Sequence, residues 1–168
     1  MAKSPAFMRP ILPKEADLIV SLDQEIFGVY GGQESPDIIR ARLAVFPAGC
    51  MILELVEDST TSHIAVYITT EKWATEREPA LNEDPHTSHH PQGQVLNITT
   101  LAIRLSYQNR GLGGLLLETV ESIAGREDCH TVVLETARAR PFYERHGYQF
   151  IGERNERGYP LYILKKKI

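Results

Sequence analysis

The residues best suited to ligand binding form a glycine-rich turn at Gln108–Gly114, called the glycine turn below. The preceding run, Val95–Ile103, is apolar and β-branched, which is typical of a buried strand. After the turn, apolar residues recur at helical spacing as far as Gly125, which is placed to cap the helix end. Glycines let the backbone approach a ligand, and the free N–H groups and dipole of a helix start favour negative charge. This strand–turn–helix unit therefore predicts an anion-binding site.

Two common phosphate-binding motifs are incomplete at this turn. The phosphate loop of ATPases needs Lys-Ser or Lys-Thr after its second glycine, where this sequence has Gly114 and Leu115. A dinucleotide-binding fingerprint needs a third glycine where Leu116 stands, although Glu135 lies where a ribose-binding acid would be expected. The glycines can also serve only to close a turn between a strand and a helix. The choice among these alternatives depends on a second motif.

That second motif lies downstream, at Ala139–Tyr148. The segment fits the pattern Ala-x-x-Phe-Tyr-x-x-x-Gly-aromatic, and Gln108, Gly111 and Gly113 fit the pattern Gln-x-x-Gly-x-Gly. Both resemble signatures of the GNAT acetyltransferase superfamily, and they occur in that family's order, one helix and one strand apart. The resemblance implies that the glycine turn binds the pyrophosphate of acetyl-CoA.

The rest of the chain predicts elements that suit the same fold. Strands are expected at Phe7–Ile11, Cys50–Glu57, His63–Thr70, Val95–Ile103, Thr131–Thr136, Tyr148–Glu153 and Tyr159–Lys165. Helices are expected at Pro13–Phe27, Pro36–Phe46, Leu112–Gly125 and Arg138–His146, with Ser35 as the N-cap of the second. The segment Lys72–Gly93 has no periodicity, and we expect a lid or a disordered loop.

These elements and the resemblance define the expected architecture. The strand–helix–strand portion implies a parallel pair of strands inside a mixed sheet. The resemblance implies the GNAT acyl-CoA N-acyltransferase fold, of mixed α/β (α+β) class. Its central sheet is mixed and mostly antiparallel, with helices on both faces. Residues 1–168 are expected to form a single domain.

Composition excludes several classes of protein. The chain has 168 residues, a net charge of -4 and no basic stripe, so we expect no nucleic-acid partner. Lys165–Lys167 is interpreted as a solvated strand end. No apolar run reaches the roughly 18 residues of a membrane span, so we expect no membrane partner. Cys50 and Cys129 lie far apart, which suits a reducing cytoplasm.

The resemblance implies acetyl-CoA (coenzyme A) as the cofactor and a set of residues that bind it. Backbone N–H groups at the glycine turn would hold the pyrophosphate, and the main chain before the turn would pair with the pantetheine arm. That pairing requires a local gap between Val95–Ile103 and the strand that starts near Thr131. The expected cofactor-binding residues are Leu101, Ala102, Ile103, Gln108, Asn109, Arg110, Gly111, Leu112, Gly113 and Gly114. No metal is expected.

Acetyl transfer to an amine also requires an acid and a neutral nucleophile. A phenol of pKa about 10 can protonate a thiolate whose thiol has a pKa of about 8.5, and Tyr143 is the candidate for this catalytic role. An alkylamine of pKa about 10 is only about one part in a thousand neutral at pH 7. Candidates for taking its proton are Glu54, Glu135, His86, His89 and His90, besides a chain of water molecules, and no single base is selected.

Further details resemble the arylalkylamine (serotonin) N-acetyltransferase branch. They are the insertion after Trp73, the Leu101–Ile103 triplet and the Pro141–Arg145 segment. In that branch two histidines relay protons, and their positions hold Asn97 and Thr99 here. The leading hypothesis is an acetyl-CoA-dependent N-acetyltransferase in the cytoplasm that acts on the primary amine of a small molecule, such as an arylalkylamine or a polyamine. The alternative is a non-catalytic acetyl-CoA-binding sensor or partner-binding module, and either is expected as a monomer or homodimer.

Overall fold

A computed structural model describes residues 6–156 and 158–168. Its seven-stranded sheet has the order β1-β2-β3-β4-β5-β7-β6. The strands are β1 (Ala6–Pro10), β2 (Met51–Val56), β3 (Ser62–Trp73), β4 (Val95–Ile103), β5 (Thr131–Thr136), β6 (Gln149–Glu156) and β7 (Tyr159–Lys167). The helices are α1 (Ala16–Phe27), α2 (Pro36–Val45), α3 (Pro85–Ser88), α4 (Leu112–Arg126) and α5 (Arg140–Arg145).

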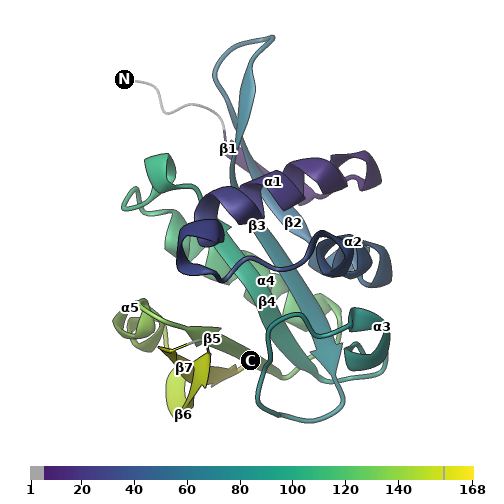
Figure 1. The fold of residues 1–168 in the computed structure, drawn as a ribbon, viewed down its shortest axis with the longest axis vertical. Helices are drawn as coiled ribbons and strands as arrows, with labels where there is room; N and C mark the ends of the chain where they lie inside the picture. Colours follow the sequence, from purple (N-terminus) through teal and green to yellow (C-terminus); the bar gives the residue numbers. More distant parts are fainter. Residues whose placement is uncertain (1–5, 157) are drawn as a thin grey trace.

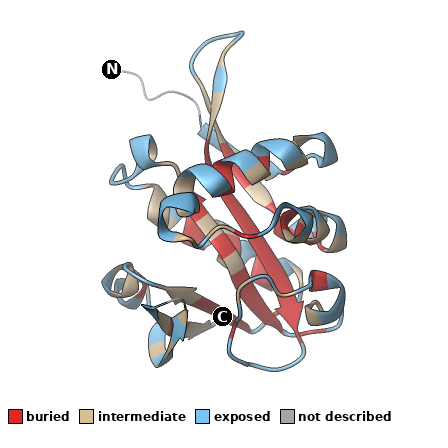
Figure 2. Cartoon of the chain, viewed as in Figure 1, coloured by how far each residue is buried: buried red, intermediate tan, exposed pale blue. Residues whose placement is uncertain are grey.

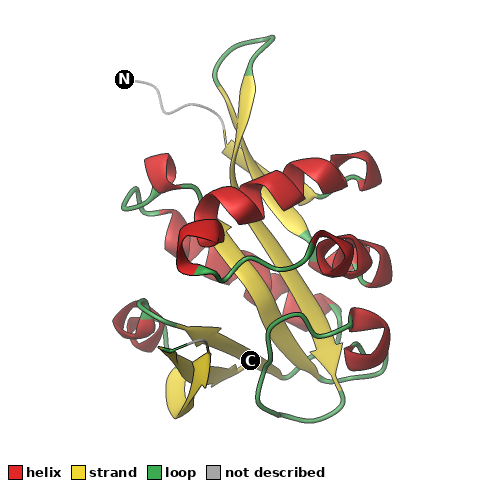
Figure 3. Ribbon diagram, viewed as in Figure 1, coloured by secondary structure: helices red, strands yellow, loops and turns green. Residues whose placement is uncertain are grey.

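The sheet lies between two layers of helices, as the sequence predicts. Helices α1 and α2 cross one face of the sheet, and α4 runs behind the other face (Figures 1 and 3). All neighbouring strands are antiparallel except β4 and β5, which are joined through α4 and run parallel. The predicted mixed and mostly antiparallel sheet with helices on both faces is therefore confirmed.

Strand periodicity gives the two faces different cores. On the α4 face, Leu96 and Ile98 of β4 pack with Leu116 and Val120 of the helix. On the other face, a separate cluster lies beneath α1 and α2 and includes Tyr67 of β3. The central strands β3 and β4 are buried along most of their length (Figure 2). The sheet thus separates two hydrophobic cores, one on each of its faces.

Local sequence explains where α2 and α4 begin and end. The Ser35 side chain accepts a hydrogen bond from the Ile38 N–H at the start of α2, as expected for this N-cap. The prediction that Gly125 caps α4 is wrong, because the helix continues to Arg126. Asp128 instead takes the left-handed conformation, with φ of 57°, and the Cys129 N–H bonds back to the Ala124 carbonyl. A short polar side chain thus occupies the position usually held by glycine.

The aperiodic segment after β3 has more structure than the sequence predicts. β3 continues to Trp73, and α3 forms after Asp84, whose side chain accepts from the His86 N–H. The His90 N–H donates to the Lys72 carbonyl at 2.7 Å, which fastens the segment to the end of β3. Of the two expectations for this segment, the disordered loop is therefore wrong, and the lid stays a prediction. No helix in the described ranges is long and apolar enough to cross a membrane.

Candidate functional site

Strands β4 and β5 are paired at one end only. Their parallel ladder joins Val95–Asn97 to Thr131–Val133 and then stops. Beyond it, β4 remains paired with β3, and β5 remains paired with β7. The unpaired interval between Ile98–Ile103 of β4 and Leu134–Thr136 of β5 is called the splay. It is the gap that the resemblance implies at this position, and it leaves main-chain hydrogen-bonding groups of both strands without a strand partner on that side.

A β-bulge in β4 lies where the splay begins. Ile98 is opposite Thr70 and Thr100 is opposite Thr69 in the ladder with β3, so Thr99 has no residue opposite it. A bulge leaves one residue unpaired and bends its strand. The bulge therefore coincides with the point at which β4 diverges from β5.

The glycine turn lies beyond the open end of β4. Gln108 donates from Nε2 to the carbonyl of Ile103 at 3.0 Å, which fastens the turn to the strand. Asn109 and Gly111 have positive φ values of 59° and 78°, and Gly111 is the N-cap of α4. A methyl group on Gly111 would have no atom within 4 Å, so the space beside this helix start is open. The first N–H groups of α4 have no acceptor within the helix and are available to an anion.

The other glycines of the turn have a packing role that the sequence did not reveal. A methyl group at Gly113 would lie 2.5 Å from Cζ of Phe142, so the ring of α5 packs directly on the first turn of α4. His146 lies beside the same turn, with Nε2 3.8 Å from where a methyl group on Gly114 would be, and its Nδ1 donates to the Phe142 carbonyl at 2.8 Å. The two predicted motifs are thus in direct contact.

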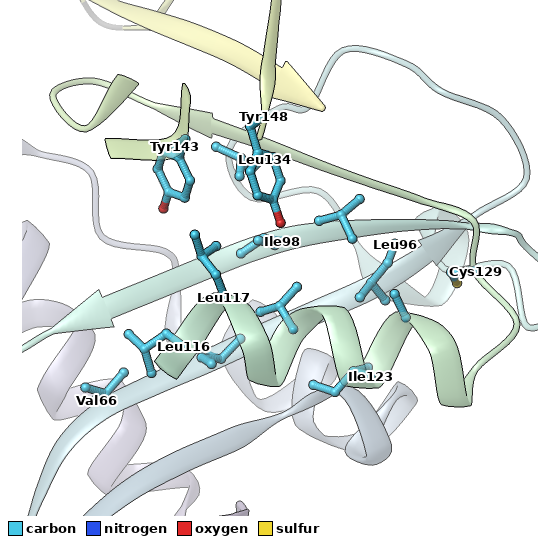
Figure 4. Close-up of a cluster of buried hydrophobic side chains, with 14 of the residues drawn as sticks. Val66, Leu96, Ile98, Leu116, Leu117, Ile123, Cys129, Leu134, Tyr143 and Tyr148 are labelled. Carbon is cyan, nitrogen blue, oxygen red and sulfur yellow. The ribbon is translucent and has the colours of Figure 1, made fainter. Parts of the chain in front are cut away.

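Tyr143 enters the core from α5, on the α4 side of the splay (Figure 4). Its side chain is 7% exposed and packs edge-on against Phe142 and Tyr148, with centroid separations of 5.2 and 5.7 Å. The hydroxyl points away from α5 towards Leu117 of α4 and makes no hydrogen bond within the described residues (Figure 4). Burial raises the pKa of Tyr143 to about 12, so the phenol is protonated at neutral pH.

The opposite side of the splay is polar. Thr69 and Thr99 share a hydrogen bond of 2.6 Å between their hydroxyls. Asn97 is 3% exposed, and its Oδ1 has no hydrogen-bond partner in the described structure. Further along the same face, Tyr67 donates to Asp23 of α1 at 2.5 Å. Burial raises the pKa of Asp23, and burial followed by the Asp23 charge raises that of Tyr67. This set, comprising Asp23, Tyr67, Thr69, Asn97 and Thr99, is called the polar face.

A buried ion network borders the polar face. Arg42 of α2 is 4% exposed and donates to both carboxylate oxygens of Glu34, at 2.9 and 2.7 Å, and to Glu71 at 3.2 Å. The Glu71 carboxylate also accepts from the Trp73 indole at 2.7 Å and from Ser88 at 2.8 Å. Burial alone would lower the pKa of Arg42, but the two carboxylates outweigh it and the net shift is upward. The network holds α2, β3 and the following segment together.

Known proteins share part of this sequence's pattern and the whole of its fold. A family model described as an acetyltransferase (GNAT) domain matches residues 79–150. The loading GNATL domain of CurA from Lyngbya majuscula superposes with a TM-score of 0.82 at 18% identity, over 97% of this chain and 98% of that one. The GphF GNAT-like decarboxylase in complex with isobutyryl-CoA has a TM-score of 0.77 at 18% identity, over 96% and 98%.

The chain has the GNAT fold. A further structure with this fold, that of the NatC complex bound to Gag peptide and CoA, has a TM-score of 0.73 at 18% identity, over 97% of this chain and 98% of that one. No curated protein sequence matches. Structures that share this fold thus include a complex bound to a peptide and CoA and a GNAT-like decarboxylase bound to isobutyryl-CoA.

Within this GNAT fold, both carboxylates considered as bases are engaged by arginines. Glu135 of β5 receives two hydrogen bonds from Arg154 of β6, at 2.7 and 2.6 Å. Glu54 accepts from Ser62 and from Arg9, and these bonds lower the pKa of its carboxyl. Glu54 lies on β2, which is separated from the splay by β3.

Two of the three histidines of the aperiodic segment also have side-chain partners. The ring of His89 stacks on Phe46 at 4.8 Å, and its Nδ1 accepts from the Lys72 N–H at 3.0 Å. Burial lowers the pKa of His89, which favours the neutral form that this bond requires. His86 pairs with Asp84 at 2.9 Å. No group of three or more potential metal ligands lies in the described ranges.

Proposed function

We propose that the chain is an acetyl-CoA-dependent N-acetyltransferase that acts on the primary amine of a small molecule. The observation that carries this proposal is the alignment of the splay with the glycine turn at the end of the same strand. A pantetheine arm can add to the unpaired edge of β4 while a diphosphate binds at the start of α4. The chemistry of the donor set, backbone N–H groups at a helix start, fits an anion.

Ten residues are proposed to form the cofactor site, most by binding the cofactor and the others by shaping the turn that binds it. The main chain of Leu101 and Ala102 would pair with pantetheine, whereas the Ile103 carbonyl already accepts from Gln108. Gln108 therefore acts by shaping the turn. The N–H groups from Asn109 to Gly114, Arg110 and Leu112 included, would surround the diphosphate.

Tyr143 is proposed as the acid in the transfer step. The amine nitrogen attacks the thioester carbonyl carbon, the C–S bond breaks, and the electron pair leaves on sulfur. The Tyr143 phenol gives its proton to that sulfur, and the proton lost by the amine returns through solvent to the phenolate. Because the pKa of Tyr143 is raised to about 12, transfer to the free thiolate would be uphill. We therefore expect proton transfer to accompany C–S cleavage.

The amine is proposed to arrive from the side of the sheet that carries α1 and α2. On that side the polar face lies at the splay, while the α4 side is filled by apolar side chains. The resemblance to the arylalkylamine branch places arylalkylamines in the panel of acceptors to test, beside polyamines. Edge strands β1 and β6 are the surfaces through which a homodimer would pair, if the chain is not a monomer.

The alternative is a sensor that binds acetyl-CoA without turnover. The observation that favours it is that Glu54 and Glu135, the two carboxylates considered as bases, are engaged by arginines. A thiol-release assay with a panel of amines separates the two functions. The proposed enzyme releases coenzyme A in proportion to one class of amine, whereas the sensor binds acetyl-CoA and releases none above background. Loss of acetyl-CoA binding altogether would contradict both.

A further inference from the structure

Asn97 lies on the polar face at the closed end of the splay, where the β4–β5 ladder stops. In the ladders it is opposite Glu71 of β3 and Val133 of β5, and it is the last residue of β4 that pairs with β5. Its neighbours in sequence, Leu96 and Ile98, belong to the core on the α4 face. Strand alternation therefore directs the Asn97 side chain to the face covered by α1 and α2.

The unsatisfied oxygen of Asn97 indicates a missing donor. Buried polar atoms are nearly always hydrogen-bonded, and each exception needs an explanation. Only three buried side-chain oxygens or nitrogens in the described residues have no partner, namely those of Gln33, Asn97 and Tyr148. Of these, Asn97 alone is on a strand that borders the splay and faces α1 and α2. A ligand that brings an N–H group to the splay would satisfy it.

The charged groups around Asn97 are already neutralised by one another. On β3, Glu71 is engaged by Arg42, Ser88 and the Trp73 indole. On β5, Glu135 is engaged by Arg154 of β6.

Further along the face, the Asp23 carboxylate of α1 accepts from Tyr67 and from the Glu34 N–H, and Glu34 is paired with Arg42. Arg77, from the segment after β3, bonds Glu83. The carboxylates of Asp23 on α1, Glu71 on β3 and Glu135 on β5 are thus each engaged by other groups.

We propose that Asn97 Oδ1 accepts a hydrogen bond from the acceptor amine, and that this amine is weakly basic. The inference rests on the proposed transferase function. An asparagine positions an N–H group but cannot remove a proton, so the proposal takes the amine to enter already neutral rather than to lose its proton through a chain of water molecules. An α-amine of pKa about 8 is about one tenth neutral at pH 7, against about one thousandth for an alkylamine of pKa about 10. Aromatic amines and α-amines are therefore favoured over alkylamines such as polyamines.

The positioning role is tested with Asn97→Leu, which keeps the shape of the side chain and removes its polar atoms. We expect kcat/KM for the amine to fall at least tenfold and the Kd for acetyl-CoA to stay within twofold. We also expect Tm to be unchanged or higher, because an unpaired buried oxygen is removed. Thr131→Val is the matched control. Thr131 is 1% exposed and lies on the same face, at the end of the β4–β5 ladder away from the splay. Its Oγ1 shares a hydrogen bond of 2.9 Å with Nδ1 of His130, so Tm should fall slightly, whereas kcat/KM and the Kd should stay near wild type.

The basicity of the acceptor is tested with wild-type protein. Amines of graded pKa are compared at pH 7, and kcat/KM is followed with pH for one α-amine and one alkylamine. The proposal predicts a tenfold rise per pH unit that ends at each amine's own pKa, and about a hundredfold preference for the α-amine at pH 7. A plateau well below the amine's pKa would reveal a base in the protein and overturn this half of the proposal.

Each failure has a distinct signature. Equal kcat/KM in wild type and Asn97→Leu would overturn the positioning role while leaving the transferase function in place. No thiol release with any amine, in a protein that binds acetyl-CoA, would overturn the transferase function and this assignment with it.

Discussion

The two sides of the splay are built from the same strands but with opposite chemistry. Towards α4 and α5, the walls are apolar, and the proposed anion site consists of main-chain N–H groups at a helix start. Towards α1 and α2, the walls carry hydroxyls, an amide and buried ion pairs, and Asn97 and Tyr67 lie among them. One β-bulge, at Thr99, lies where the two sides meet.

This difference separates a proposed site made of backbone groups from one made of side chains. The proposed diphosphate site consists of backbone groups, so the requirement on the sequence is a spacing of glycines. The proposed acceptor site consists of side chains, so the requirement is a particular set of polar groups at positions set by the fold. Substitutions on the two sides are therefore expected to have different effects on cofactor affinity, stability and acceptor use.

The largest effect is expected on the cofactor side, from Gly113→Ala. The added methyl would lie 2.5 Å from Cζ of Phe142, so α5 or the start of α4 must move. Such overpacking costs about 1–3 kcal/mol, and we expect the Kd for acetyl-CoA to rise at least tenfold. Gly125→Ala in the same helix is the control, because nothing lies within 4 Å of its methyl, and it should stabilise by about 0.5–1 kcal/mol. Calorimetric titration and urea unfolding give both values, and equal Kd values would refute the packing role.

On the other side, Tyr67→Phe should lower stability without affecting the cofactor. It leaves Oδ1 of Asp23 buried without its hydroxyl donor, which costs about 1–3 kcal/mol of unfolding free energy. Tyr148→Phe, which removes a buried hydroxyl that has no partner, should cost nothing or stabilise. A similar loss in both variants would show that the Tyr67–Asp23 bond contributes little. The Kd for acetyl-CoA should match wild type in each.

Alkaline pH tests the buried phenols on both sides together. Burial raises the pKa of Tyr143 to about 12 and raises that of Tyr67 further, against an unfolded value of about 10. The folded state therefore binds more protons above pH of about 10, so stability is full below that pH and falls as pH rises through about 12. Urea midpoints should decline over this window, and less steeply in Tyr143→Phe. A flat profile would show that these phenols ionise equally in both states.

The smallest effect on stability is expected from the surface contact between Arg138 and Tyr30, which links the two sides of the splay. Arg138, just after β5, lies over the Tyr30 ring at 4.6 Å and donates to its hydroxyl at 3.2 Å. Such an exposed contact contributes about 0.5–1 kcal/mol, so Arg138→Ala should lower unfolding free energy by no more than this. A larger loss would mean that the α1–α2 connection is held mainly by this pair.

The cofactor side could be predicted from sequence largely because its constraints are local. The glycine spacing, the strand before it and Tyr143 all lie within short segments with their own periodicity, and the observed β4, α4 and α5 follow them. The contact between Gly113 and Phe142 escaped prediction because it joins two helices that are separated by a strand.

The hydrogen bonds of the polar face and of the ion network beside it could not be predicted, because they join residues that are far apart in the sequence. Tyr67 and Asp23 are 44 positions apart, and Arg42 and Glu71 are 29 apart. Nothing in the local pattern of either segment encodes such a pair. The end of α4 was missed for a different reason, since Asp128 takes a conformation for which glycine is the usual signal.

The proposed transfer step is tested most directly by comparing Tyr143→Phe with Tyr148→Phe under saturating amine and acetyl-CoA. Both rings belong to the same buried cluster, and each substitution removes only one oxygen. We predict that kcat for coenzyme A release falls by about tenfold or more in Tyr143→Phe, because the leaving sulfur loses its proton donor, and stays near wild type in Tyr148→Phe. An unchanged kcat in Tyr143→Phe, or an equal fall in both variants, would contradict the role of Tyr143 as the acid.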